Sequence, residues 1–370
     1  MTSALEHGTE DTPGRLGAVL RAAGNDRPRA LGRHGPWVAT TLDQARTVLT
    51  DPATYDFPVD VSRRAVRRAE MRGRSPHGVV APLSHERAAR AAAVMRTELD
   101  LELAHAVGAQ HDAMALLRGP VARSTTVATL PGLAESDRDR VADAVLAWVD
   151  ALGPVIASPR PLRAWSRARR NEDGARHRLE TLLAQLGSAD PPGTATVLAA
   201  GTQVPVAAGA WLLVGLAERP EVQDRLHTGG LAPVQVVWEV LRVAPPTWVT
   251  ARVTRRETTL AGVRLPEGGV VLVSPLLLGR LADLVPAGEC DRGAERVVLD
   301  PGRWDDATAR PGAWLPFGAG PHACPGRTVG LAQLTELTSW AAAHRLDLVS
   351  PAYVDQSRGI FPRPALVEIS

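Results

Sequence analysis

The chain contains no lysine, so all 42 of its basic side chains are arginine. It also has only two asparagines, a bias typical of a GC-rich genome. The formal net charge is +2 over 370 residues, which does not indicate a polyanionic ligand. We therefore predict no nucleic-acid partner.

Cysteine is scarce too, because Cys290 and Cys324 are the only two in the chain. Two thiols exclude a disulfide framework of the kind that stabilises small secreted domains. The first residues, MTSALEHGTEDTPGRL, are polar and resemble neither a signal peptide nor a membrane anchor. We therefore expect a cytoplasmic location.

Charge is absent from one long stretch, residues 191–217. Its length suffices to cross a bilayer. It is rich in Ala and Gly, however, and it carries Thr, Gln and Pro. A helix that is apolar on all sides is also typical of the centre of a large helical protein. We favour a buried central helix, and we predict no membrane partner.

The remaining pattern predicts a mainly α protein with a small β region. Residues 1–35 are rich in Gly, Pro and Arg and predict an irregular N-terminal segment, whereas residues 36–370 read as a single domain. A short strand and a helix, the latter beginning after Thr41 or Asp43, are expected at 35–51. Further helices are expected at 84–106, 109–131, 135–156, 162–187, 193–218, after Arg219, at 232–243 and at 325–345. Alternating Thr and Val with turn residues predict strands at 245–274, and a strand pair is expected at 346–370.

The most informative motif surrounds Cys324, in the stretch FGAGPHACPG from Phe317 to Gly326. A cysteine in such a loop has several possible roles. It can be an inert packed thiol, or a nucleophile with His322 as its base. A zinc site lacks a second cysteine pair. The remaining role is that of axial thiolate ligand to haem iron, with glycines that let the backbone approach a flat macrocycle.

The ten residues resemble the haem-binding signature of the cytochrome P450 family, F-x-x-G-x-[HR]-x-C-x-G. The resemblance implies the cytochrome P450 fold, with haem b between the central helix and the cysteine-loop helix and with Cys324 as the metal ligand. It implies haem contacts for the following residues: Phe317, Gly318, Gly320, His322, Gly326, His85, Arg252 and Arg90. In place of the arginine that the family usually carries four residues after His85, this chain has Ala89, with Arg90 next.

A second motif supports the resemblance. Glu239 and Arg242 form an E-x-x-R pair, and residues three apart share one face of a helix. By the order of motifs in the family, Arg303 of the sequence DPGRW is expected to join the pair. We predict a structural Glu239–Arg242–Arg303 cluster behind the cysteine loop.

The central helix departs from the family. Most members carry an A-G-x-[DE]-T motif, whose acid and alcohol help to deliver protons to dioxygen. Here the sequence is AGTQVP, so Gln203 and Val204 occupy those two positions after Gly201. Pro205 follows; it lacks an N–H and is expected to kink the helix and leave the Gly201 carbonyl without its helical donor. These four residues are the predicted catalytic groove.

The resemblance implies an oxidoreductase of specialised metabolism that acts on a small molecule or peptide. Monooxygenation with a ferredoxin and an NAD(P)H-dependent ferredoxin reductase is the first hypothesis. Oxidative coupling or ring formation without oxygen insertion, a non-turnover haem protein and a thiol hydrolase are the alternatives. Substrate contacts are expected at Trp248, Val249, Leu198 and Phe361. Six arginines at 63, 64, 67, 68, 72 and 74 are compatible with an acidic or carrier-bound substrate, or with a solvated loop.

Overall fold

The computed structural model describes residues 12–58, 81–104, 108–158, 162–289, 291, 297–306, 308–356 and 359–370. The chain forms two compact units. The first consists of Met1–Ala81 and Trp238–Pro325, and the second of Pro82–Val237 and Gly326–Ser370. The arginines of the 63–74 loop, and Cys290, lie outside the described residues. The prediction of one domain from residue 36 onward stays a prediction.

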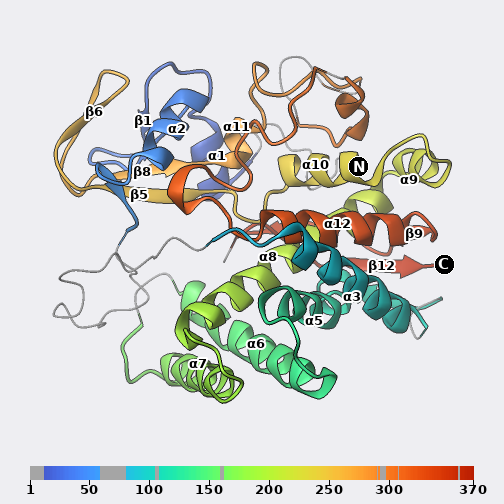
Figure 1. Ribbon diagram of the computed structural model, residues 1–370. Coiled ribbons are helices and arrows are strands. Elements are labelled where there is room, and N and C mark those ends of the chain that lie inside the picture. The colour runs from blue at the N-terminus through green and yellow to red at the C-terminus, as the bar shows by residue number, and fades with distance from the viewer. Residues whose placement is uncertain are drawn as a thin grey trace. The chain divides into compact units, whose positions relative to one another are not determined.

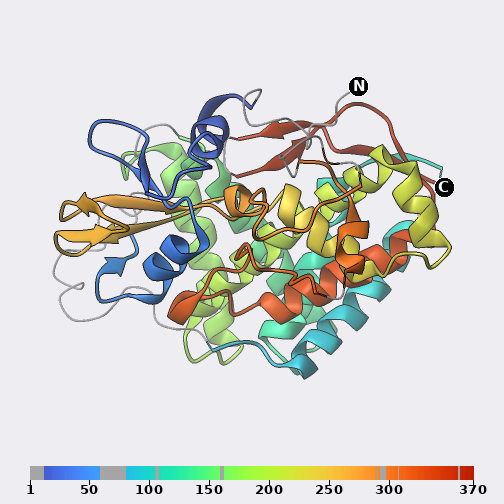
Figure 2. The same ribbon diagram turned by 90° about the horizontal axis from the view of Figure 1, so that it is seen from above.

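The first unit is built on a five-stranded sheet with the strand order β1-β2-β8-β5-β3. Strands β1, β8 and β5 are labelled in Figure 1. The strands are β1 (Arg29–Ala30), β2 (Trp37–Val38), β8 (Val270–Val273), β5 (Thr250–Thr254) and β3 (Tyr55–Asp56). Strands β2 and β8 are parallel, and the other neighbours are antiparallel. A separate hairpin, β6 (Thr258–Leu260) and β7 (Val263–Leu265), follows β5 and is seen from above in Figure 2. The predicted strand cluster at 245–274 is thus present.

Short helices complete the first unit. They are α1 (Gly14–Leu20), α2 (Leu42–Thr50), α11 (Pro275–Leu278) and the 3-10 turns η1 (Pro301–Asp305) and η2 (Gly320–His322). Helix α10 (Pro233–Val243) begins just before the unit's second segment. The hydroxyl of Thr41 accepts a hydrogen bond from the Gln44 N–H, so it caps α2 as the sequence predicts.

The second unit is mainly helical. Its helices are α3 (His85–Leu103), α4 (Ala113–Leu116), α5 (Arg118–Thr129), α6 (Glu135–Ile156), α7 (Arg167–Gln185), α8 (Pro191–Glu218), α9 (Pro220–His227) and α12 (Arg327–Ala341). Its strands are β4 (Gln110–Asp112), β9 (Leu346–Leu348), β10 (Tyr353–Asp355), β11 (Phe361–Arg363) and β12 (Leu366–Ile369). Strand β12 lies between β4 and β9, and β10 pairs with β11.

Helix α8 is the centre of the second unit. Every residue from Pro205 to Ala217 is buried, and α8 contacts α4, α5, α6, α7, α9 and α12. Gly209 permits this packing, because a Cβ there would lie 2.8 Å from Leu117 and 2.9 Å from Leu337. By length and composition α8 could cross a membrane, but 72% of its most apolar window is buried. This burial favours the interpretation as a core helix.

Three expectations differ from the structure. Residues 12–35 are not irregular, since they hold α1 and β1. The stretch 109–131 is not one helix, because β4 pairs with β12 at the far end of the chain and Asp112 then caps α4. The C-terminal strand pair is instead four strands in two sheets. Each difference comes from pairing with distant residues, which a local pattern does not contain.

Candidate functional site

The cysteine loop belongs to the first unit and presents an exposed thiol. The Cys324 N–H donates a hydrogen bond of 2.8 Å to the Phe317 carbonyl, which closes the loop on itself. Gly318 and Gly320 have φ angles of +69° and +72°, which side-chain-bearing residues rarely adopt. The glycines of the motif therefore serve the backbone path that sets the position of Cys324.

Gly320 also allows a close approach to the end of α2. A Cβ at this position would lie 2.5 Å from the Leu49 carbonyl oxygen and 2.9 Å from the Thr50 Cα. The turn η2 therefore packs directly against the backbone of α2, and the loop is held from behind by a regular element. Gly326, two residues after Cys324, is the N-cap residue of α12.

A cation and an imidazole meet at one aromatic ring in the first unit. The guanidinium carbon of Arg252 lies 3.9 Å from the Phe57 ring centroid. The ring centroids of Phe57 and His322 are 4.8 Å apart, with an edge-to-face angle of 78°. Phe57 thus separates and positions Arg252 and His322, the two side chains of this unit that the resemblance assigns to haem propionates.

Arg252 is a buried cation that lacks a carboxylate partner among the described residues. It is 4% exposed, and its Nη1 donates to the Thr250 hydroxyl and the Ala251 carbonyl. Burial lowers the pKa of Arg252 below its ordinary value, and the Asp56 charge only partly opposes this. A buried guanidinium in this state favours an anion that can accept its remaining N–H donors.

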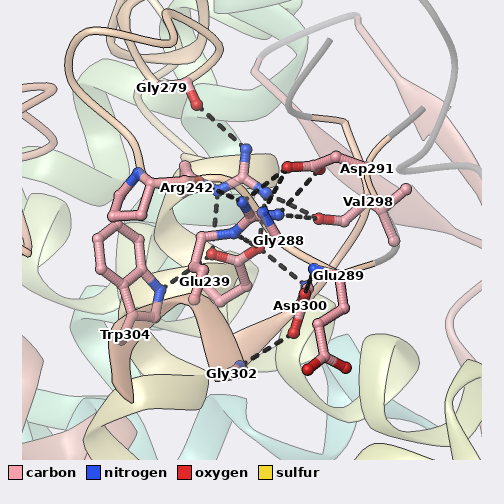
Figure 3. A network of polar contacts seen from close by, with 12 residues as sticks. Glu239, Arg242, Gly279, Gly288, Glu289, Asp291, Val298, Asp300, Gly302 and Trp304 are labelled. Carbon is pink, nitrogen blue, oxygen red and sulfur yellow. Dashed lines mark hydrogen bonds and ion pairs between the residues drawn. The ribbon is translucent and has the colours of Figure 1, made fainter. Parts of the chain in front are cut away.

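Glu239, Arg242 and Arg303 form one buried cluster in the first unit. Figure 3 shows Glu239 and Arg242 with Trp304 and Asp291 around them. Arg242 binds both oxygens of the Glu239 carboxylate, at 2.9 and 2.5 Å, and Arg303 Nε donates to Oε1 at 2.9 Å. The Trp304 indole and the Asp300 backbone N–H also donate to this carboxylate. The structure therefore brings together the three residues that the sequence predicted as a structural cluster.

Arg303 has a second anionic partner that sequence reasoning missed. Its Nη1 and Nη2 donate to the two oxygens of Asp291 at 3.0 and 3.1 Å. Burial alone would lower the pKa of Arg303, but the charges of Glu239 and Asp291 raise it well above its ordinary value. Burial likewise acts to raise the pKa of Asp291, and hydrogen bonds from Arg303 and Gly288 outweigh it, so the pKa is lowered.

An aromatic cluster connects the Glu239 cluster to the cysteine loop. Trp304, which donates to Glu239, stacks at 5.2 Å on Trp314. Trp238 meets Trp314 and Phe317 edge-to-face, at 6.0 and 6.2 Å between ring centroids. Since the Phe317 carbonyl accepts the Cys324 N–H, the chain of contacts from Glu239 to the thiol loop is continuous within this unit.

The predicted groove residues lie on α8 in the second unit. Val204 is 38% exposed and Gln203 is partly buried, while Pro205 is buried. The Gly201 carbonyl, which Pro205 cannot reach with an N–H, is not left free. The Thr125 hydroxyl of α5 donates to it at 2.8 Å. The expectation of an open acceptor at Gly201 was therefore wrong.

The remaining predicted haem contacts lie at the start of α3. His85 is the exposed first residue of this helix. Arg90 pairs with Glu86 one turn earlier, at 2.6 Å, and both side chains are exposed. Their roles toward haem stay predictions.

The predicted substrate contacts fall in different surroundings. Trp248 is 6% exposed, and its carbonyl accepts the Ser274 hydroxyl; Val249 is partly buried beside it. Leu198 is fully buried in the core that α8 shares with α6 and α7, so its burial gives a substrate role no support. Phe361 is the partly buried first residue of β11.

Comparisons with known proteins agree with this geometry. A family model described as Cytochrome P450 matches residues 234–340, the stretch that holds the Glu239 cluster and the Cys324 loop. The fold matches that of a 6-coordinated cytochrome P450 from Thermus thermophilus, with a TM-score of 0.69, 21% identity, and coverage of 91% of this chain and 92% of that chain.

Residues 234–340 match the cytochrome P450 family, and the chain has the cytochrome P450 fold. Among curated P450 relatives, pentalenene oxygenase of Streptomyces avermitilis is 33% identical over 171 residues, which are 39% of this chain and 36% of the relative. Cyclooctat-9-en-7-ol 5-monooxygenase of Streptomyces melanosporofaciens is 32% identical over 168 residues, 40% of this chain and 35% of the relative. The matched part spans about a third of the length of these curated relatives.

P450 proteins are haem-thiolate proteins that bind haem b, and the residues of the first unit fit this cofactor. Cys324 offers an exposed sulfur in a loop of fixed backbone. Arg252 offers a buried positive charge that calls for a carboxylate. A cysteine thiolate is one of the axial ligands that proteins offer to haem iron, and a guanidinium pairs well with a propionate carboxylate.

Sequence reasoning missed Phe57 and Thr125. Phe57 is one of only three phenylalanines, but nothing local connects it to Arg252 or His322. Thr125 lies 76 residues before the carbonyl that it binds. The one available signal was Pro205, because a proline inside a helix leaves the carbonyl four residues earlier without its N–H donor.

Proposed function

We propose that this P450 is an oxidoreductase of specialised metabolite biosynthesis that carries out O2-dependent monooxygenation of a small molecule or peptide. We further propose a cytoplasmic location and electron supply from a ferredoxin and its NAD(P)H-dependent reductase. The observation that carries the proposal is the Cys324 loop, whose exposed thiol is held by the Phe317 hydrogen bond and by two left-handed glycines.

In this proposal the chain's residues have separate tasks. Bound haem supplies the activation of dioxygen. Cys324 holds the iron, while Arg252 and His322, separated by Phe57, bind the propionates. The Glu239 cluster keeps the loop in place through Trp304 and Trp314. On α8, Gln203 donates and accepts hydrogen bonds but does not titrate, so protons come from water or from the substrate itself.

The curated relatives support a small-molecule substrate. Two of them are named for the oxidation of pentalenene and of cyclooctat-9-en-7-ol. We extend to this chain only the class, a small and mostly apolar molecule. An acidic or carrier-bound substrate is the alternative, and it depends on the arginines at 63–74.

The first experiment tests thiolate ligation. The visible spectrum of the reduced, carbon monoxide-bound protein is recorded for the wild type and for Cys324→Ser. We expect the Soret shift typical of a thiolate ligand in the wild type and its loss in the variant. A wild-type protein that purifies without haem, or two identical spectra, would contradict the proposal.

A second readout does not depend on spectra. Because the Cys324 thiol is exposed, it is expected to react with iodoacetamide in the haem-free protein and to be protected once haem is bound. Peptide mass spectrometry locates the label. Equal labelling with and without haem would show that Cys324 is not the ligand.

Oxidative coupling is the second candidate, and the absence of an acid and an alcohol at Gln203 and Val204 favours it. The two reactions differ in product mass, because monooxygenation adds one oxygen whereas coupling removes two hydrogens. A product formed in labelled dioxygen decides between them. If NAD(P)H and oxygen are not consumed with any substrate, the chain is a haem-binding protein without turnover.

A further inference from the structure

Pro205 lies inside the continuous helix α8, and the carbonyl that it leaves without a backbone donor has a partner outside the helix. Proline lacks the N–H that would bond the carbonyl four residues earlier, and its ring displaces that carbonyl. Four residues before Pro205 this carbonyl belongs to Gly201, and the Thr125 hydroxyl donates to it at 2.8 Å. A side chain of α5 thus takes the place of the missing backbone donor of α8.

Gly201 makes this contact possible. A Cβ at Gly201 would lie 2.9 Å from Cγ2 of Thr125, closer than carbon atoms pack. The absence of a side chain at 201 lets α5 approach until the hydroxyl reaches the carbonyl. The three residues therefore depend on one another. Pro205 leaves the Gly201 carbonyl without a backbone donor, Thr125 supplies a donor, and the missing side chain at Gly201 lets Thr125 come close enough.

Gln333 of α12 fixes the direction of the hydrogen bonds. Its Nε2 lies 3.1 Å from the Thr125 hydroxyl and 3.0 Å from the Ser124 hydroxyl. Ser124 in turn donates to the Ala91 carbonyl of α3 at 2.6 Å. Each hydroxyl has a single hydrogen, which a carbonyl already receives. Both hydroxyls must therefore accept from the Gln333 amide, and this fixes its orientation.

We infer that Thr125 is a positioning residue for the catalytic groove, and that with Gln333 it holds the Gly201–Pro205 turn of α8 from α5 and α12. The contact geometry stands by itself, whereas its importance for the groove rests on the proposed function. Ser124 and Thr125 are buried, with exposures of 0% and 4%, and Gln333 is 1% exposed. Water therefore does not reach these side chains, and a hydrogen-bonding group that loses its partner here lowers the stability of the fold.

A double-mutant cycle between positions 125 and 205 tests the inference. Thr125→Val keeps the shape and removes the hydroxyl, and Pro205→Ala restores the backbone N–H that the Gly201 carbonyl lacks. In the wild-type background we expect Thr125→Val to lower the folded-to-unfolded ratio about tenfold, because a buried acceptor loses its donor. In the Pro205→Ala background the loss falls to about twofold, since the carbonyl keeps a donor.

The matched control is Thr126→Val on the same helix. Thr126 is equally buried, but its hydroxyl donates to the Ala122 carbonyl of α5 itself, at 2.8 Å. Thr126→Val should lower the folded-to-unfolded ratio by the same factor in the wild-type and the Pro205→Ala background. Thr125→Ser, which keeps the hydroxyl, should restore most of the stability that Thr125→Val loses.

Amide hydrogen exchange of the haem-loaded protein supplies a local readout. We expect Thr125→Val to accelerate exchange in peptides that cover 198–206, with no matching change in peptides of α6. Equal losses in the two backgrounds, or acceleration spread evenly over both helices, would overturn the inference. Neither measurement uses turnover, so the inference and the proposed function fail separately.

Discussion

Glu239 is the single residue on which the first unit's polar core depends. Its carboxylate is fully buried and accepts five hydrogen bonds, two from Arg242 and one each from Arg303, Trp304 and Asp300. Buried charges are tolerated only when they are paired and hydrogen-bonded. Two guanidinium groups depend on this one anion, although Asp291 shares the charge of Arg303.

Glu239→Gln is therefore expected to destabilise the protein strongly. The amide removes the charge and points an N–H₂ group at donors, which leaves buried cations without their partner. We expect a loss of about 3–5 kcal/mol in the free energy of unfolding, measured from urea midpoints. Glu257→Gln, which breaks the exposed pair with Arg264, is the control and should change little. Similar midpoints for both variants would contradict the account.

His344 predicts a pH dependence in the second unit. Its ring centroid lies 4.9 Å from that of Trp340. Burial lowers the pKa of His344 below the ordinary 6.5. The charge of Asp100 acts to raise this pKa, whereas Arg96 and His227 lower it further. Below pH 6.5 the unfolded chain therefore binds a proton that the folded chain binds only at lower pH. The contribution of neutral His344 is complete above this pH and is lost as the pH falls.

His344→Gln should accordingly flatten the decrease in stability on going from neutral pH to below 6. Urea midpoints measured at three pH values above 6.5 and three below it give the slope of stability against pH. His177→Gln, at an exposed position of α7, is the control and should leave the slope as in the wild type. An unchanged slope in His344→Gln would show that burial does not hold this imidazole neutral.

At the scale of the element, α8 shows how small residues permit a buried helix. Glycine in a helix interior ordinarily costs about 1 kcal/mol relative to alanine. Gly201 and Gly209 offset this cost by letting α5 and α12 approach, since a Cβ at either position would meet a neighbouring side chain below 3.0 Å. The weak helix propensity of α8 is therefore a consequence of its close packing.

Gly201→Ala thus has the opposite sign to the propensity rule. We expect it to destabilise by about 1–3 kcal/mol, because the new methyl group pushes Thr125 away and breaks its bond to the 201 carbonyl. Gly174→Ala on α7 is the matched control. Its Cβ meets only the end of the Arg178 side chain, at 3.5 Å. This variant should gain up to about 1 kcal/mol. A gain in both variants would contradict the described packing of α5 on α8.

The elements themselves were predictable where a local pattern specified them. The boundaries of α6 agree with the predicted 135–156, and its first turn is acidic. Helices α8 and α10 agree closely with their predicted ranges, because each begins at a proline. The stretch around β4 was not predictable, since its strand exists only by pairing with β12. The Glu239 cluster was predictable from spaced motifs, whereas the ligand role of Cys324 stays a prediction. Phe57 and Thr125 were not predictable, because their partners are set by tertiary packing.

At the scale of the molecule, neither unit is a continuous segment. The chain enters the second unit at Pro82, leaves it after Val237, and returns at Gly326. The last 45 residues supply α12 and β12, and their partners α3, α5 and β4 come from the first part of the same unit. Gln223 of α9 likewise bonds the backbone of Leu346 through both ends of its amide.

A chain that ends at Pro325 is therefore expected not to form the second unit. It lacks the central strand of the β4-β12-β9 sheet and the helix that bears Gln333. We expect no cooperative urea transition in circular dichroism for that unit. Co-expression with residues 326–370 as a separate chain is the control and should recover part of the transition. A full transition in the truncated chain alone would contradict this prediction.

The one-way order of hydrogens around Gln333 has a consequence for proton movement. A chain of hydroxyls conducts protons only if each bond can reverse. Here the amide hydrogens end on hydroxyls, and the hydroxyl hydrogens end on the carbonyls of Gly201 and Ala91, which have no hydrogen to pass on. The junction of α5, α8 and α12 is therefore an insulator for protons, and it fixes α8 without opening a leak through the helical core.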